Sequence, residues 1–115
     1  MSVEVLDPED AKLATLARAS RARIGAREGA AVRDTHGRTY AAGSIELPSL
    51  SLSALKAAVA MAVASGAGGL EAAVVVTDAV AIDAGDVDAV RDVAGAGARV
   101  YRADHAGSVV DALTT

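Results

Sequence analysis

The sequence of 115 residues contains no cysteine, no phenylalanine and no tryptophan, and it has only two tyrosines. Without cysteine, the chain can form neither a disulfide nor a thiolate metal site, and it has no cysteine nucleophile. Without the largest aromatic side chains, its core must consist of Ala, Val, Leu and Ile, which bury less area per residue. Because stability grows with the apolar surface removed from water, we expect the chain to bury more of it as a homo-oligomer, a dimer or tetramer.

Long apolar runs are also missing. No uninterrupted stretch approaches the roughly 20 apolar residues that cross a membrane. Residues 1–10 are acidic and lack the apolar segment of a signal peptide. We therefore expect a cytoplasmic protein with no membrane contact. The alanine-rich composition is one that we associate with a high-GC bacterial genome, and it predicts nothing about mechanism.

The charge pattern weighs against a nucleic-acid partner. The net charge is −4, and there are almost no aromatic side chains on which bases could stack. Basic side chains do gather in residues 11–40. We interpret them as the solvated face of a helix, and the alternative is a patch for an acidic partner or RNA.

Turn and cap residues divide the chain into elements. Asp7 followed by Pro8 predicts a helix start, with aspartate as N-cap and proline in the first helical position. Residues 34–37 favour a tight reversal between two strand-like runs, which predicts a β-hairpin. The predicted elements are a helix at residues 8–22, strands at 30–33 and 38–42, a helix at 51–64, a strand at 72–77, a helix at 83–94, a strand at 99–102 and a short helix at 108–113.

This order predicts one α/β domain over residues 1–115. A hairpin followed by β-α-β units favours a sheet with parallel pairs and helices on its faces. Residues 51–64 carry Lys56 as their only charge. A helix there would be apolar all round, so we predict a buried central helix that also contributes to subunit contacts.

Several short motifs, taken in their order and spacing, resemble the cytidine deaminase family over roughly residues 8–107. They are Gly29-Ala30-Ala31-Val32, Asp34, Gly37-Arg38-Thr39-Tyr40, Gly43, Glu46, Lys56-Ala57-Ala58-Val59, the segment 90–95, and Val100-Tyr101-Arg102-Ala103-Asp104. The resemblance implies a three-layer cytidine deaminase-like fold with a mixed sheet.

Enzymes of this family hold one zinc ion through a Cys or His in a Cys/His-Ala-Glu motif and through two cysteines of a Pro-Cys-x-x-Cys motif. The zinc activates a water molecule, and the Glu relays protons. The first motif aligns with Ser53-Ala54-Leu55, so a hydroxyl replaces the ligand and an aliphatic side chain replaces the acid. The second aligns with residues 82–86, which places Asp83 and Asp86 at the thiolate positions. The resemblance therefore implies a pseudoenzyme without zinc or another cofactor.

Asp83 and Asp86 can be interpreted in two ways. Asp83 would cap a helix and Asp86 would complement its dipole, which is the interpretation we favour. Alternatively, Asp83, Asp86 and Ser53 would form an oxygen-ligand metal site. Leu55 would leave even that site without an acid or base.

A ligand contact is the other feature that the resemblance implies. The family holds sugar hydroxyls with an Asn-x-Glu segment, which corresponds here to Ser44-Ile45-Glu46. Ser44 and Glu46 are therefore candidate ligand-binding residues, although Glu46 is equally interpretable as a local cap or a surface residue. His36 and His105 have no third ligand nearby in the sequence, and we expect both at the surface.

Three functional hypotheses follow. We favour a non-catalytic deaminase-like protein that acts as an oligomeric interaction or regulatory protein, with an unknown protein partner. The first alternative is a binding module for a nucleoside-type small ligand, with a vestigial pocket near Glu46. The second is a deaminase-like hydrolase with a replaced metal site, which only Asp83 and Asp86 support.

Overall fold

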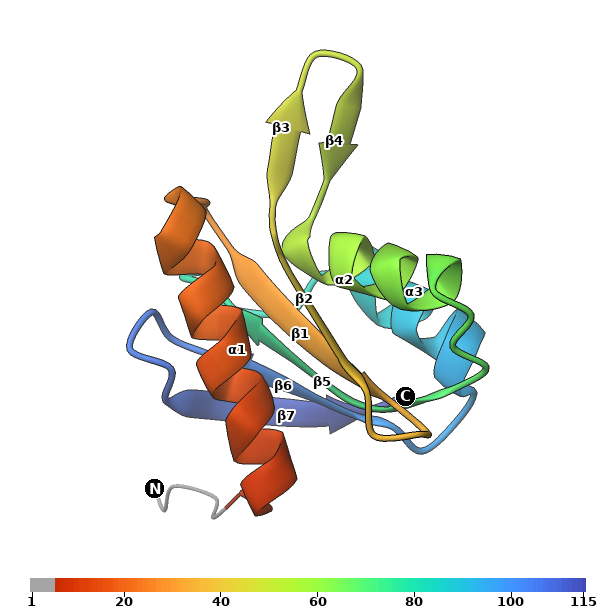
Figure 1. The fold of residues 1–115 in the computed structure, drawn as a ribbon. Coiled ribbons are helices and arrows are strands. Elements are labelled where there is room, and N and C mark those ends of the chain that lie inside the picture. The colour runs from red at the N-terminus through yellow and green to blue at the C-terminus, as the bar shows by residue number, and fades with distance from the viewer. Residues whose placement is uncertain (1–5) are drawn as a thin grey trace.

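The computed structural model describes residues 6–115 and is shown in Figure 1. Its elements are α1 (Pro8–Ile24), β1 (Gly29–Asp34), β2 (Thr39–Gly43), β3 (Ile45–Leu47), β4 (Leu50–Leu52), α2 (Ala54–Ala64), β5 (Leu70–Val76), α3 (Ala84–Ala94), β6 (Arg99–Ala103) and β7 (Val109–Thr114). No helix in this part of the chain is both long enough and apolar enough to cross a membrane.

Five of the strands form one mixed sheet in the order β2-β1-β5-β6-β7. β5 and β6 run parallel, and the other neighbouring pairs are antiparallel. β3 and β4 form a separate two-stranded hairpin that projects from the body in Figure 1. The predicted mixed sheet is confirmed, and β5-α3-β6 is the unit whose parallel strands are direct neighbours.

The sheet lies between helices, as the three-layer prediction required. α1 covers one face, and α2 and α3 cover the other (Figure 1). The two sides of β5 face different cores: Ala73 and Val75 pack on the side of α2, and Val74 and Val76 pack on the side of α1. Alternation along a strand with both faces buried explains why the sequence of β5 is continuously apolar.

The first three elements form where the sequence predicts them. The carboxylate of Asp7 accepts a hydrogen bond from the Glu9 N–H at 2.8 Å, and Pro8 opens α1. Gly37 takes a positive φ of 82° in the turn between β1 and β2, a conformation that favours glycine. The predicted hairpin is confirmed, with Ala30 opposite Ala42 and Val32 opposite Tyr40.

The predicted final helix at residues 108–113 is wrong. Residues 109–113 lie instead in β7, which pairs antiparallel with β6 and continues the sheet. The guanidinium of Arg102 in β6 fixes the pairing, since it donates to both carboxylate oxygens of Asp111 at 3.0 and 2.7 Å. A six-residue run with two adjacent valines fits a strand as well as a helix, and the free edge of β6 decides the outcome.

The helix predicted at residues 51–64 also begins later than expected. Ser51 and Leu52 belong to β4, and Ser53 is the N-cap of α2. Its hydroxyl accepts from the Lys56 N–H at 3.2 Å, which ends the strand and starts the helix. The short hairpin of β3 and β4 is not predicted by any sequence pattern.

Candidate functional site

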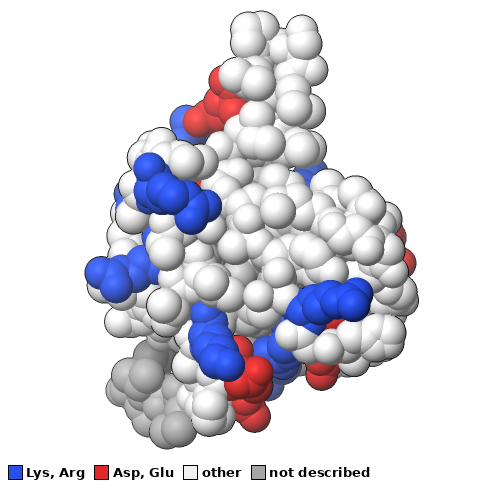
Figure 2. Space-filling model, in the orientation of Figure 1, with Lys and Arg blue, Asp and Glu red and all other residues white. Residues whose placement is uncertain are grey.

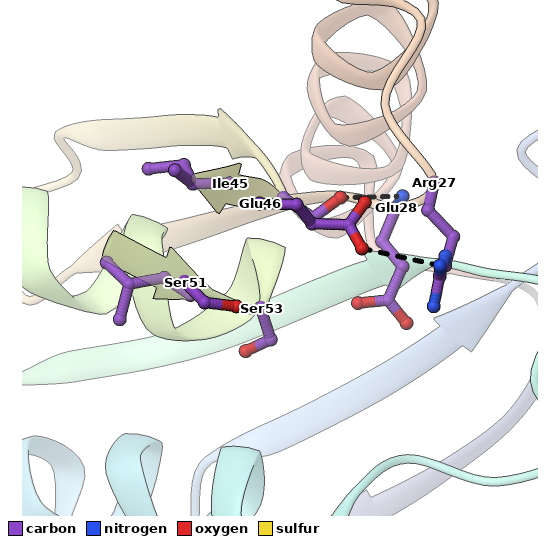
Figure 3. Close-up of a pocket in the computed structure, with 8 residues that line it drawn as sticks. Arg27, Glu28, Ile45, Glu46, Ser51 and Ser53 are labelled. Atoms are coloured by element: carbon purple, nitrogen blue, oxygen red, sulfur yellow. Dashed lines mark hydrogen bonds and ion pairs between the residues drawn. The ribbon is translucent and has the colours of Figure 1, made fainter. Parts of the chain in front are cut away.

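A cavity of about 210 Å³ lies at the base of the hairpin of β3 and β4 (Figure 3). It brings together three residues that the sequence analysis singled out, namely Ser44, Glu46 and Ser53. Its full lining consists of Arg27, Glu28, Ser44, Ile45, Glu46, Ser51, Leu52 and Ser53. The lining therefore combines hydroxyls, two carboxylates and one guanidinium with two aliphatic side chains.

Ser44 holds the start of the hairpin against the segment before β1. Its hydroxyl accepts a hydrogen bond from the Glu28 N–H at 3.2 Å, and its own N–H donates to the Glu28 carbonyl at 3.1 Å. Because a serine hydroxyl can accept and donate at once, the hydroxyl proton of Ser44 remains able to donate to a ligand.

Glu46 faces Arg27 across the mouth of the cavity, as Figure 3 shows. The two side chains are 3.3 Å apart and both are well exposed, at 59% and 71%. An exposed pair of this kind contributes about 0–1 kcal/mol, so a ligand can exchange with it at little cost.

Ser53 and Asp86 join the N-termini of α2 and α3. The hydroxyl of Ser53 donates to Asp86 Oδ1 at 2.7 Å, and Lys56 Nζ lies 4.0 Å from the same oxygen. Asp86 is only 4% exposed. Burial raises the pKa of Asp86, and the nearby charge of Asp83 raises it further, whereas the Ser53 hydrogen bond and Lys56 act in the opposite direction.

Asp83 and Leu55 serve other purposes. Asp83 is exposed and caps α3, where its carboxylate accepts from the Gly85 N–H at 3.0 Å. Leu55 is fully buried in the core between α2 and the sheet, and it does not line the cavity. Of the four positions aligned with the family's motifs, Ser53 and Asp86 meet directly, Asp83 lies close to Asp86, and Leu55 is separate.

The histidines lie elsewhere. His36 is exposed in the turn between β1 and β2, as expected, whereas His105, in the turn between β6 and β7, is half-buried and not at the open surface that we expected. Across residues 6–115, no group of three or more His, Cys, Asp or Glu side chains is arranged to hold a metal ion. A second hollow of about 330 Å³ beside α1 contains none of the candidate residues, and its charged side chains, Glu9 and Lys12, pair with each other at 3.2 Å.

Glu28 lines the cavity although no sequence pattern predicts it there. Its carboxylate accepts a hydrogen bond from the Thr77 hydroxyl at 2.8 Å, which links the entry to β1 with the end of β5. A single glutamate before a strand gives no sequence signal for such a position. Only the antiparallel pairing of β1 with β5, which places Gly29 opposite Val76, brings the two residues together.

Comparison with known proteins agrees with this arrangement. A family model described as "Cytidine deaminase-like" matches residues 6–107. The chain belongs to the cytidine deaminase-like family. A search of curated proteins found no match.

Solved structures of cytidine deaminases share the fold of this chain. Cytidine deaminase from Burkholderia pseudomallei is similar with a TM-score of 0.77 and 20% sequence identity, over 90% of each chain. Cytidine deaminase from Mycobacterium leprae is similar with a TM-score of 0.73 and 21% identity, over 94% of each chain. At such identities, the likeness shows the shared fold.

Proposed function

We propose that this chain is a non-catalytic member of the cytidine deaminase-like family, which acts as an oligomeric interaction or regulatory protein. The observation that carries the proposal is the hydrogen bond between Ser53 and Asp86. Ser53, Asp83 and Asp86 stand at the positions aligned with the zinc ligands, and this bond joins two of them to each other. The third, Asp83, caps a helix. Structural and catalytic zinc sites in proteins are built mostly from thiolate and imidazole ligands. This hydroxyl and these carboxylates do not fit zinc.

The position aligned with the catalytic glutamate supports the same proposal. Leu55 has no accessible surface and packs in the core. An aliphatic side chain can neither accept nor donate a proton, so this position supplies no acid or base. The alternative of a hydrolase with a replaced metal site rests on Asp83 and Asp86, which both have structural partners.

Metal analysis combined with an activity assay tests the proposal. Protein purified without added metal should contain zinc far below one ion per chain, and it should release no ammonia from cytidine before or after zinc is added. An active cytidine deaminase assayed in parallel verifies the conditions. One zinc ion per chain together with ammonia release would contradict the proposal.

The oligomeric part of the proposal rests on the outer face of α2. Met61 is 44% exposed and Val63 is 50% exposed, next to the exposed Ala60 and Ala64. Figure 2 shows that the middle of this side of the molecule carries almost no charged side chains, which lie mainly around its edge. An uncharged face of this kind is typical of a surface that a second protein covers, and we infer that a copy of the chain covers it.

Sedimentation at micromolar concentration tests self-association. We expect a dimer or tetramer for the wild type and a folded monomer for Ala60→Asp, because Ala60 is exposed in the single chain. Val59→Asp is the matched comparison: Val59 is only 7% exposed, so it should disturb folding itself. A wild-type monomer, or an Ala60→Asp variant that assembles like the wild type, would contradict the oligomer.

A second function, binding of a nucleoside-type small ligand, is favoured by the cavity. Ser44 and Glu46 both line it, and their polar groups have either a free proton or an exchangeable partner. A thermal-shift screen with cytidine and uridine tests this function. Stabilisation that Glu46→Gln weakens would support nucleoside binding, and no stabilisation by either cytidine or uridine would contradict it.

A further inference from the structure

Glu28 contributes a carboxylate to the cavity wall, and its position is fixed. Figure 3 places this carboxylate between Arg27 and Ser53. Glu28 Oε2 accepts from the hydroxyl of Thr77, which is 4% exposed and in turn accepts from the Ala79 N–H at 3.1 Å. Because Thr77 is held by the backbone, it holds the carboxylate of Glu28 in one orientation.

The charges of the cavity do not balance at this carboxylate. Arg27, the only cation in the lining, pairs with Glu46. Within residues 6–115, no lysine or arginine forms an ion pair with Glu28, and Thr77 is the one side chain that donates to it. One oxygen, Glu28 Oε1, therefore accepts nothing from this part of the chain. This oxygen is not shielded from solvent, so a ligand donor, most effectively a charged one, can take the place of a water molecule there.

The remaining lining narrows the ligand class. Ser44 offers a hydroxyl proton, Glu46 and Arg27 offer an exchangeable pair, and Ile45 and Leu52 form an apolar side. The volume of about 210 Å³ lies below the range of about 300–1,000 Å³ for drug-sized ligands. An anionic ligand is disfavoured, because the unpaired negative charge of Glu28 would repel it. These features call for a small ligand that carries a cation and hydroxyl groups.

We propose that the cavity binds a small hydroxylated primary amine, of the amino sugar or amino alcohol class, with its ammonium group on Glu28 and its hydroxyls on Ser44 and the pair of Arg27 and Glu46. This inference rests on the proposal above that the cavity is a ligand site lined by Ser44 and Glu46, but it assigns to that site an amine in place of a nucleoside. Glu28 is the residue that determines specificity, because it distinguishes an ammonium group from a neutral hydroxyl.

An NMR titration of the whole chain with glucosamine and with glucose tests the inference. The two sugars differ in one group, which is an ammonium in glucosamine at about pH 6, below the pKa of a primary amine. We expect glucosamine to shift the amide signals of Glu28 and Ser44 and to bind at least about tenfold more tightly than glucose, as a charge-assisted hydrogen bond predicts. Added salt should reduce this preference.

Two variants test whether Glu28 causes the preference for glucosamine over glucose. Glu28→Gln keeps the shape and an acceptor for Thr77, and it should lower the affinity for glucosamine to that for glucose. Asp92→Asn changes the net charge equally at an exposed site on α3 and should leave both affinities unchanged.

The outcomes separate this inference from the ligand-binding function itself. If glucose or uridine binds in the cavity as tightly as glucosamine, and Glu28→Gln changes nothing, the cavity binds ligands but the amine inference is wrong. If glucosamine shifts no signal around the cavity, or shifts signals only elsewhere, the inference is also wrong.

Discussion

Two buried aspartates occupy opposite electrostatic situations. Asp34, at the end of β1, is 2% exposed, and Asp86, at the start of α3, is 4% exposed. Asp34 accepts hydrogen bonds from the N–H groups of His36 and Arg38, both at 2.9 Å, and from the Tyr40 hydroxyl at 3.0 Å. Asp86 accepts one hydrogen bond from a side chain, that of Ser53.

The difference in donors reverses the direction of the pKa shift. Burial by itself raises the pKa of Asp34, but the hydrogen bonds from Arg38, Tyr40 and His36 bring it below its usual value. Burial raises the pKa of Asp86, and one hydroxyl with a lysine at 4.0 Å does not offset it. The hairpin turn is thus a self-sufficient element of the fold, whereas the junction of α2 and α3 holds a carboxylate that is only partly compensated.

The largest effect is expected for a buried carboxylate that has no hydrogen-bond donor, in contrast to Asp34 and Asp86. The substitution Leu55→Glu creates such a carboxylate. Leu55 lies in the core with no accessible surface, so we expect a loss of at least about 4 kcal/mol in the free energy of unfolding. Urea denaturation followed by circular dichroism measures the loss, with Leu55→Met as a control of similar volume that should cost less than about 1.5 kcal/mol. We also expect no cytidine deamination by Leu55→Glu, and a stable, active variant would contradict our alignment.

Removing the best-satisfied carboxylate should give the next largest effect. In Asp34→Asn, the amide oxygen can still accept from the N–H groups of His36 and Arg38, but the amide N–H₂ cannot accept from the Tyr40 hydroxyl, and the negative charge that strengthens all three hydrogen bonds is lost. We expect the melting temperature to fall by roughly 5–10 °C. Asp92→Asn, at an exposed position, is the control and should change it little. Equal melting temperatures for the two variants would refute the role of Asp34.

The hydrogen bond between Ser53 and Asp86, which links α2 to α3, should contribute less to stability than the hydrogen bonds of Asp34. Ser53→Ala removes the N-cap of α2 and the one hydroxyl that donates to Asp86, which we expect to cost about 1–2 kcal/mol. Ser53→Thr retains the hydroxyl and should recover most of this loss. If alanine and threonine variants unfold at the same urea concentration, the hydroxyl contributes nothing to stability.

Asp86→Asn should have the smallest effect at neutral pH, and its sign should depend on pH. The pKa of Asp86 in the folded chain lies above the ordinary value of 3.8. The contribution of Asp86 to the free energy of unfolding is therefore most favourable below pH 3.8 and is lost as the pH rises through the folded pKa. An amide keeps an acceptor for Ser53 without acquiring a charge. We therefore expect the variant to gain stability relative to the wild type as the pH rises through that range.

Asp34 should show the opposite pH dependence. The pKa of Asp34 in the folded chain lies below 3.8. Its contribution to the free energy of unfolding is therefore present above pH 3.8 and is lost as the pH falls through the folded pKa. Urea midpoints of the wild type, Asp34→Asn and Asp86→Asn across acidic to neutral pH measure both trends. The comparison fails if Asp86→Asn destabilises the neutral protein more than Asp34→Asn does.

Sequence patterns predicted those parts of the fold that depend on local signals. Asp7 with Pro8 located α1, and residues 34–37 located the hairpin. β7 was predicted as a helix because a short apolar run has no decisive period, and pairing with β6 determines its structure. The three-residue strands β3 and β4 are too short to show an alternation.

The candidate site was predictable in part. The family resemblance identified Ser44, Glu46 and Ser53, which line one cavity. Asp86 was expected to complement a helix dipole or, in the alternative, to form a metal site with Asp83 and Ser53. Its hydrogen bond to Ser53 was not predicted, because it depends on how α2 packs beside α3. Glu28 and Thr77 meet through strand pairing across 49 positions of sequence, which no local pattern encodes.

Carboxyl ¹³C NMR titration of the chain, with and without excess zinc, tests most directly the claim that Asp86 is a structural residue and not a metal ligand. We predict that Asp34 titrates below 3.8 and Asp86 above it, and that zinc changes neither the carboxyl signal of Asp86 nor its pKa. A stoichiometric shift of the Asp86 signal on adding zinc, with a pKa driven below 3.8, would contradict the account.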